Sequence, residues 1–207
     1  MRASADDDLK SDPRRRAILE HARPHFIREG FAGTKIEPIA REAGVSTATL
    51  YGFFAGKAEL FDAVIEDTAD GFGRTLDGLR RIDGLPREQL LRFAGAYADF
   101  MGDPFVRSVF RLVVAERPRF QSVALHFFDR GRAEIGATLM VMLERLVEAG
   151  ELKPLPKASW AAGQLMGMIE HPVFFVPMVT GDDVTVHRSR QQIVEQAVET
   201  FMARYGA

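Results

Sequence analysis

The sequence predicts an all-α fold made of two helical domains. Apolar residues recur every three to four positions along most of the chain, and no segment shows the strict apolar–polar alternation of a half-buried strand. Turn-forming residues interrupt this pattern at intervals, as at Asp103-Pro104 and Gly181-Asp182-Asp183. With 207 residues, 46% of them hydrophobic and 27% charged, the chain is long enough to bury a substantial core.

Composition excludes several other classes of protein. The chain has no cysteine, which rules out disulfide scaffolds and thiolate metal sites. Its first ten residues lack the apolar centre of a signal peptide. The longest apolar run, 172–179, is far shorter than the ~18–20 residues that span a bilayer. We therefore expect a soluble, cytoplasmic protein with no membrane partner.

Four helices are expected in the first third of the chain, at about 14–29, 34–44, 46–53 and 57–76. Gly30 is placed to end the first helix, and Pro24 should kink it. Thr34 and Glu37 have the spacing of a capping box at the start of the second. Ser46 is the expected N-cap of the third.

Five further helices are expected beyond Gly84-Leu85-Pro86, at about 87–102, 104–115, 118–149, 157–178 and 184–205. The predicted domain organisation is a flexible arm over 1–13, a DNA-binding helix-turn-helix domain over 14–60 and a helical ligand-sensing and dimerisation domain over 61–207.

The helix-turn-helix prediction depends on the segment from Thr34 to Phe54. The apolar positions that would form the inner faces of its two helices are Ile36, Ile39, Ala40, Ala43, Leu50 and Phe54. Gly44 supplies the residue for a tight left-handed turn, and Val45 fills the space between the helices. Small or hydrogen-bonding side chains are left on the outer face of the second helix, where such a motif meets base edges and phosphates: Thr47, Ala48, Thr49, Tyr51 and Gly52. Any small helical core could contain part of this pattern.

Charge gives only modest support for a nucleic-acid partner. The whole chain carries a net charge of −2, but residues 13–61 hold eight cations and five anions, a local excess of three positive charges. Such an excess is compatible with phosphate binding.

The extended pattern I-A-x-x-A-G-V-S-x-x-T-L-Y-x-x-F-x-x-K-x-x-L-F, residues 39–61, closely resembles the N-terminal signature of the TetR family of regulators. The resemblance implies a homodimer that places two recognition helices in successive major grooves of a double-stranded DNA operator. By position it implies that Thr34, Thr49, Tyr51 and Lys57 contact phosphates, and that Thr47, Ala48 and Gly52 face the bases; for Tyr51 a contact with either is open. With the N-cap and the end of the helix, the candidate DNA-binding set is Thr34, Ser46, Thr47, Ala48, Thr49, Tyr51, Gly52, Phe53 and Lys57.

Two positions depart from the family pattern, and one cation needs an explanation. Family members usually carry Gly where this chain has Ala48, and His or Tyr where it has Phe53, which cannot donate a hydrogen bond to a phosphate. Lys57 lies at a helix start, where a cation opposes the helix dipole. A nearby phosphate explains it better than local stability does.

The second domain is expected to sense a small molecule. F-R-L-V-V-A-E-R-P-R-F, residues 110–120, and E-A-G-E-L, residues 148–152, resemble the AefR-like subgroup of TetR regulators, which implies a repressor of nearby genes. The domain is rich in Phe and Met, which mostly pack a core but can also line an adaptable apolar pocket. The candidate pocket residues for an apolar effector are Phe100, Phe110, Phe127, Met142, Met168 and His171.

The last two helices are the expected dimer interface. Gly163 and Gly167 are four residues apart and allow close helix approach, and an apolar stripe of Ile193, Ala197 and Phe201 runs along the final helix. In the family, these helices from two subunits form a four-helix bundle.

Other classes of function remain as alternatives. An all-helical enzyme could use a cavity in the second domain, although no nucleophile or acid–base pair stands out there, and the chain could be a DNA-binding dimer without an effector. His21 and His25 have metal-ligand spacing, but no third ligand is evident. Gly71-Phe72-Gly73 lacks the third glycine of a dinucleotide fingerprint. We expect no enzymatic activity, no metal and no cofactor.

Overall fold

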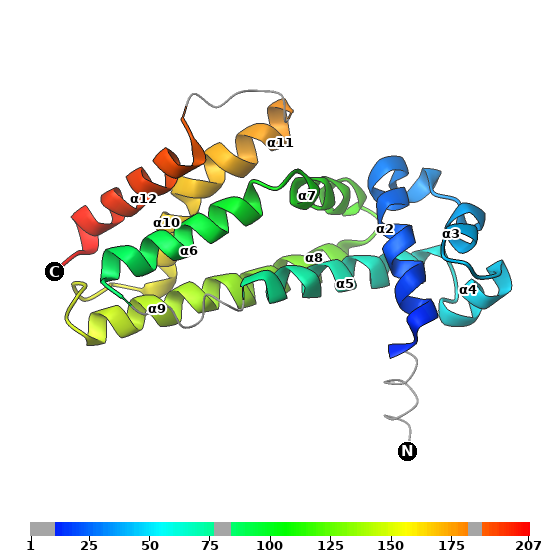
Figure 1. Cartoon of the computed structure of the whole chain (residues 1–207), viewed down its shortest axis with the longest axis horizontal. Coiled ribbons are helices and arrows are strands. Elements are labelled where there is room, and N and C mark those ends of the chain that lie inside the picture. The colour runs from blue at the N-terminus through cyan, green and yellow to red at the C-terminus, as the bar shows by residue number, and fades with distance from the viewer. Residues whose placement is uncertain (1–10, 77–83, 182–187) are drawn as a thin grey trace, which may run out of the picture. The chain divides into compact units, whose positions relative to one another are not determined.

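The computed structural model describes residues 11–76, 84–181 and 188–207, and it confirms the all-α prediction. Within these residues, the β-type pairing is one isolated bridge between Leu152 and Gly206. The helices, labelled in Figure 1, are α2 (Pro13–Gly33), α3 (Ile36–Glu42), α4 (Thr47–Phe53), α5 (Lys57–Leu76), α6 (Pro86–Met101), α7 (Pro104–Glu116), α8 (Gln121–Gly131), α9 (Ala137–Glu148), α10 (Ala158–Glu170), α11 (Val176–Thr180) and α12 (Arg190–Tyr205).

The chain folds into two compact units. Unit 1 comprises Met1–Gly71 and Leu112–Phe127, and unit 2 comprises Phe72–Arg111 and Phe128–Ala207. This division differs from the boundary expected at residue 60. Unit 1 includes most of α5 and also the segment Leu112–Phe127, which runs from the end of α7 into α8. The reason lies in that segment's contacts with α2: the Glu116 carboxylate accepts the backbone N–H of Phe31 at 3.0 Å.

The core of unit 1 is built on α2 and on a group of aromatic rings. Ile18, Ala22 and Phe26 are fully buried, as their helical spacing predicts. Phe31 packs edge-on against Phe61 at 5.6 Å between ring centroids and against Phe120 at 4.7 Å. These contacts join α2, α5 and the start of α8 into one unit.

Gly30 ends the regular part of α2, as predicted. Its φ of +67° is a left-handed conformation that favours glycine, and the chain resumes as a short helical turn up to Gly33. At Pro24 the backbone angles stay helical, so the break in α2 lies at Gly30.

Unit 2 has its core between α6, α10 and α12. Phe93 and Tyr97 of α6 are fully buried. Ile193, Ala197 and Phe201 of α12 are buried in the same core, with at most 4% of their surface exposed. The expectation that this stripe needs a second subunit to cover it is therefore wrong, because α6 of the same chain covers it.

Two long helical segments contain a π-helical turn. Segments η2 (Arg132–Gly136) and η3 (His171–Phe175) join α8 to α9 and α10 to α11 without a break in the helical path. In η3 the cause is Pro172, which lacks the N–H that a regular α-helix would use. The final helix begins at Arg190, with a capping box of Ser189 and Gln192, so its predicted start at 184 lies outside the described residues.

Candidate DNA-binding interface

Helices α3 and α4 form the predicted helix-turn-helix. Gly44 has φ +70°, and the N–H of Val45 bonds to the carbonyl of Ala40 at 2.9 Å, which closes the tight turn. Ser46 caps α4: its Oγ accepts the N–H of Thr49 at 3.0 Å. Leu50 is fully buried and fixes the inner face of α4 against the unit 1 core.

The opposite face of α4 is open to solvent. Thr47, Ala48 and Gly52 are exposed, and Tyr51 keeps half of its surface exposed. Apart from the backbone of α4 itself, no atom of the described part of the chain lies within 4 Å of the place a Cβ would take on Gly52. The face thus offers a small, polar surface with room for another molecule to approach closely, as a helix that enters a DNA groove requires.

The structure gives Thr34 a role different from the predicted one. The residue that precedes α3 is Lys35, which makes no side-chain cap, so the expected Thr34–Glu37 capping box is wrong. Thr34 is only 2% exposed, and its hydroxyl donates to the carbonyl of Gly30 at 2.6 Å. The same carbonyl also accepts the backbone N–H of Thr34 at 3.3 Å, so both the hydroxyl and the amide of Thr34 are used to close the end of α2.

Lys57 also has partners inside the protein. Its ammonium donates to the carbonyl oxygens of Thr34 at 2.9 Å and Ala32 at 3.2 Å, and it lies 4.8 Å from the ring centroid of Phe31. The expectation that local structure does not explain this cation is therefore wrong. An ammonium has three donors, so one remains for a further acceptor.

Aromatic rings at the end of α4 hold two arginines of α2. The guanidinium carbon of Arg14 lies 5.5 Å from the centroid of Phe53, and that of Arg15 lies 5.3 Å from Phe54. Neither contact is predicted by the sequence. The R-R-R run and the F-F pair are visible in the sequence, but only the fold brings them together.

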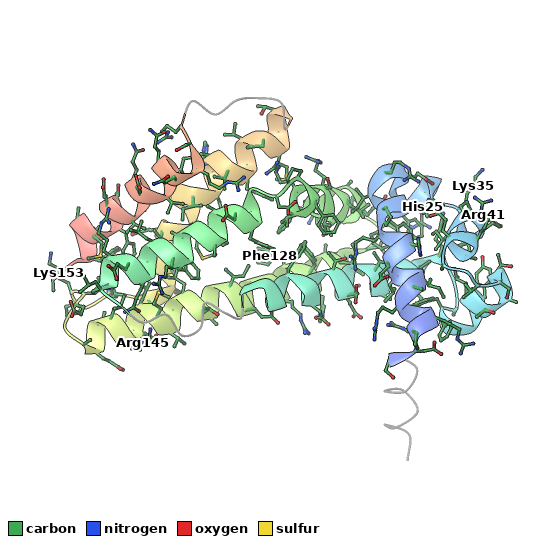
Figure 2. All side chains as sticks on the ribbon, in the orientation of Figure 1. His25, Lys35, Arg41, Phe128, Arg145 and Lys153 are labelled. Carbon is green, nitrogen blue, oxygen red and sulfur yellow. The ribbon has the colours of Figure 1, made fainter. Side chains whose placement is uncertain are left out.

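A histidine of α2 joins this helix to α3, the first helix of the helix-turn-helix. His25 is buried, and its two ring nitrogens lie 3.1 Å from Glu29 and 3.0 Å from Glu42. The hydrogen bond with His25 lowers the pKa of Glu42. Both ring nitrogens of His25 are thus engaged with carboxylates. Beyond this contact, Lys35 and Arg41 project from α3 into solvent (Figure 2).

Comparison with known protein families agrees with this geometry. Residues 18–64 match the model of bacterial regulatory proteins of the tetR family, and residues 88–207, more than half of the chain, match the C-terminal domain of AefR-like transcriptional repressors. The chain belongs to the TetR family.

Individual TetR relatives support the assignment along the whole chain. The transcriptional repressor NicS of Pseudomonas putida is 31% identical over 147 residues, which are 70% of this chain and 67% of that protein. A TetR-family regulator from Mesorhizobium loti superposes with a TM-score of 0.78 at 25% identity, over 94% of this chain and 97% of its own. The flavonoid-responsive regulator FrrA gives a TM-score of 0.73 at 25% identity, over 93% and 97% of the two chains. This TetR protein is thus a DNA-binding transcriptional regulator.

Four of the six predicted effector-binding residues of this TetR chain belong to, or pack against, one core cluster of unit 2. Phe100 and Met142 are buried in the unit 2 core, and Phe110 packs edge-on against Phe174 with ring centroids 4.9 Å apart. Met168 is partly buried at the edge of the same core, whereas His171 is exposed. Phe127 belongs to unit 1.

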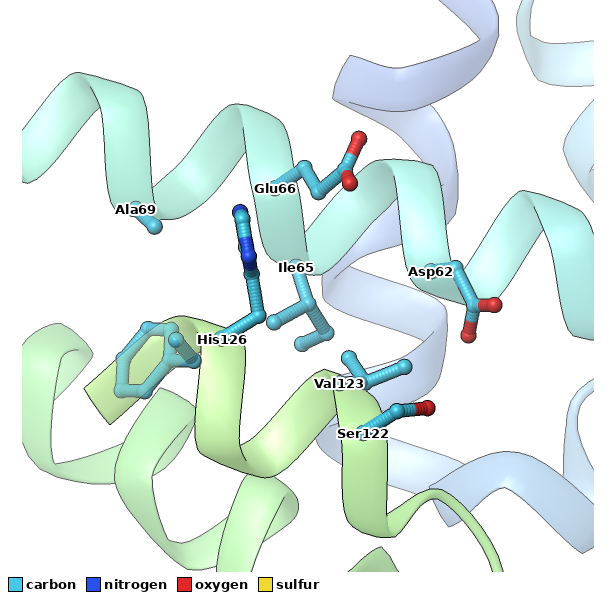
Figure 3. Close-up of a pocket in the computed structure, with 8 residues that line it drawn as sticks. Asp62, Ile65, Glu66, Ala69, Ser122, Val123 and His126 are labelled. Carbon is cyan, nitrogen blue, oxygen red and sulfur yellow. The ribbon is translucent and has the colours of Figure 1, made fainter. Parts of the chain in front are cut away.

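Unit 1 of the TetR chain contains a cavity of about 260 Å³ between α5 and α8 (Figure 3). Its lining is mixed rather than apolar: Asp62, Ile65, Glu66, Ala69, Ser122, Val123, His126 and Phe127. Burial raises the pKa of Asp62, with further contributions from the neighbouring charges of Glu66 and Glu59. Phe127 is the one predicted pocket residue that lines this cavity.

Proposed function

We propose that this TetR regulator binds a double-stranded operator as a homodimer and represses transcription until a small molecule releases it. The observation that carries the proposal is the open face of α4. Helix α4 is anchored by buried Leu50 and capped by Ser46, so its outer side chains are held rigidly for recognition. In this account Thr47, Ala48 and Gly52 approach base edges.

Phosphate contacts are assigned to residues at the margin of that face. Thr49 and Tyr51 carry hydroxyl groups on exposed or half-buried parts of α4. Lys57 offers its remaining donor, and the carbonyl of Thr34 positions its ammonium. Thr34 itself acts by this positioning, because its own hydroxyl is committed to Gly30.

The dimer interface is assigned to the outer face of α10, η3 and α11. Among the described residues, no atom outside the helix's own backbone lies within 4 Å of a Cβ placed on Gly163 or Gly167, so another helix could approach closely there. Exposed apolar side chains continue the same stripe in both directions: Trp160 at 65%, Phe175 at 52% and Val179 at 69% exposure. Covering such a stripe is favourable, and a two-fold dimer would cover it on both subunits.

An apolar effector is proposed for unit 2, near Phe100, Phe110, Met142 and Met168. Soft, aromatic side chains of this kind can repack around a ligand. FrrA, which shares this fold at 25% identity, is by its name responsive to a flavonoid, an aromatic compound. No helix among the described residues is long and apolar enough to cross a bilayer. We assign no enzymatic activity to the chain.

The test is selection of duplexes from a random-sequence pool, followed by titration of the enriched complex with apolar aromatic compounds. A two-fold symmetric sequence should be enriched, and an effector should both raise the thermal midpoint and release the DNA, because it must prefer the non-binding conformation. If no sequence is enriched, the DNA-binding proposal fails. If compounds stabilise the protein but leave DNA affinity unchanged, the effector proposal fails.

A further inference from the structure

The N-terminus of α2 is fixed against the C-terminal end of α4 by two cation–ring contacts. Arg14 lies over Phe53 at 5.5 Å and Arg15 over Phe54 at 5.3 Å. Phe54 is buried and belongs to the core, whereas Phe53 is half-buried and lies at the margin of the recognition face. Arg14 is the more exposed of the two arginines, with 63% of its side chain open to solvent.

Arg14 is held on its other side by Asp12. The two make a fork of two hydrogen bonds, Nη2 to Oδ2 at 2.7 Å and Nε to Oδ1 at 3.2 Å. Asp12 also caps α2 through the N–H of Arg14 at 2.8 Å. Because a guanidinium has five N–H donors, the fork leaves three of them for another acceptor.

The length of α4 indicates what that acceptor would be. A helix of seven residues is ~10 Å long. The major groove is ~12 Å wide. If the N-terminal residues of α4 meet the bases, its C-terminal end reaches the edge of the groove, where the sugar–phosphate backbone runs. A guanidinium fixed at Phe53 is then beside a phosphate, an acceptor that matches its planar donor geometry.

Asp12 orients Arg14 for this contact without taking the donors that the phosphate would use. Its carboxylate accepts from Nε and Nη2, and bonding to Arg14 lowers the pKa of its carboxyl group, so the charge is present at neutral pH.

We propose that Phe53 is a positioning residue for DNA binding: its ring holds Arg14 at the C-terminal end of the recognition helix, where Arg14 contacts a backbone phosphate. This inference rests on the proposed DNA-binding function. It gives Phe53 a role that needs no hydrogen bond of its own, and it makes Arg14 part of the binding surface.

The experiment measures affinity of the full chain for the duplex that the wild type enriches from a random pool, by fluorescence anisotropy at 50–200 mM KCl. The variants are Arg14→Ala, Phe53→Leu, the double variant and Phe53→Tyr, which keeps the ring. Arg16→Ala is the matched control, because Arg16 is an exposed cation of the same run. Thermal midpoints verify that each variant is folded.

The salt dependence should report the lost phosphate contact. Each phosphate neutralised contributes a slope of ~0.9 to log K against log salt, so two Arg14 side chains in a dimer contribute ~1.8. When KCl rises from 50 to 200 mM, the affinity of Arg14→Ala should therefore fall by a factor that is ~12-fold smaller than the factor for the wild type. An unchanged slope in Arg14→Ala would overturn the proposal.

Coupling between the two residues should report the positioning role. Loss of a cation–ring contact of this kind corresponds to a ~2- to 5-fold loss of DNA affinity per subunit. Because a dimer loses the contact twice, Phe53→Leu should weaken binding by ~5- to 30-fold when Arg14 is present. It should have little effect in the Arg14→Ala background, and Phe53→Tyr should retain the wild-type affinity. The positioning role of Phe53 would be refuted if Phe53→Leu weakened DNA binding equally with and without Arg14. It would also be refuted if Phe53 were coupled to Arg16 as strongly as to Arg14. Failure of the wild type to enrich any sequence is a separate result, which would remove the underlying DNA-binding function.

Discussion

Replacing Lys57 with Met separates two explanations of this residue. The change keeps most of the aliphatic stem and removes the ammonium, which donates to the carbonyls of Thr34 and Ala32 and lies over the ring of Phe31. If the cation served DNA alone, the DNA-free protein would not be affected. The structure instead predicts that the variant is less stable without any DNA present.

The magnitude follows from those three contacts. Hydrogen bonds of this type contribute about 0.5–1.5 kcal/mol each, and an exposed cation–ring contact about 0.5–1 kcal/mol. Lys57 is only half-buried and such terms are not additive, so we expect a net loss of about 2 kcal/mol. For a chain of this size, that corresponds to a fall of about 4–8 °C in the thermal midpoint.

Thermal and urea unfolding of the DNA-free protein, followed by circular dichroism, measure this loss. Lys35→Met is the matched control, because Lys35 is exposed at the start of α3 and makes no side-chain cap. We expect a change within about 0.5 kcal/mol for the control. Equal midpoints for Lys57→Met and the wild type would refute the assignment of the ammonium to the Thr34 and Ala32 carbonyls.

Three other predictions follow from single contacts. Tyr97→Phe should lower the free energy of unfolding by about 1.5–3 kcal/mol in urea titrations, because buried Tyr97 donates to the carboxylate of Glu170. An unchanged urea midpoint would contradict that hydrogen bond. Burial raises the pKa of Asp62, so the wild type should lose stability as the pH rises through the folded-state pKa of this residue. Asp62→Asn should remove that loss. Thermal midpoints between pH 4 and 7 that fall equally in the wild type and the variant would contradict this prediction. Gly167→Leu should convert dimers to monomers in sedimentation runs, whereas a stable dimer would move the interface away from α10.

The sequence was sufficient for the helices and for the inner side of the helix-turn-helix. Helical spacing identified the buried positions of α2, and the Gly44 turn followed from local chemistry that needs no tertiary context. The exposure of Thr47 and Tyr51 followed in the same way, from their place opposite Leu50.

Tertiary contacts account for what the sequence did not predict. Carbonyl groups at the end of α2 accept the hydroxyl of Thr34 and the ammonium of Lys57, two groups that a family pattern assigns to phosphates. The apolar stripe of α12 looked like an interface, because a pattern on one helix cannot say whether its partner is another subunit or α6 of the same chain. The contact of Arg14 with Phe53 joins residues 39 positions apart, beyond the reach of local periodicity.

The central claim is that the outer face of α4 reads DNA sequence, and the base preferences of a Thr47 variant test it most directly. The wild type and Thr47→Ala should each be used to enrich duplexes from the same random pool. The account predicts a two-fold symmetric site whose preference changes in Thr47→Ala at one equivalent position of each half, with other positions retained and a loss of ~1–3 kcal/mol in discrimination there. Identical preferences for the two proteins at every position would contradict the claim.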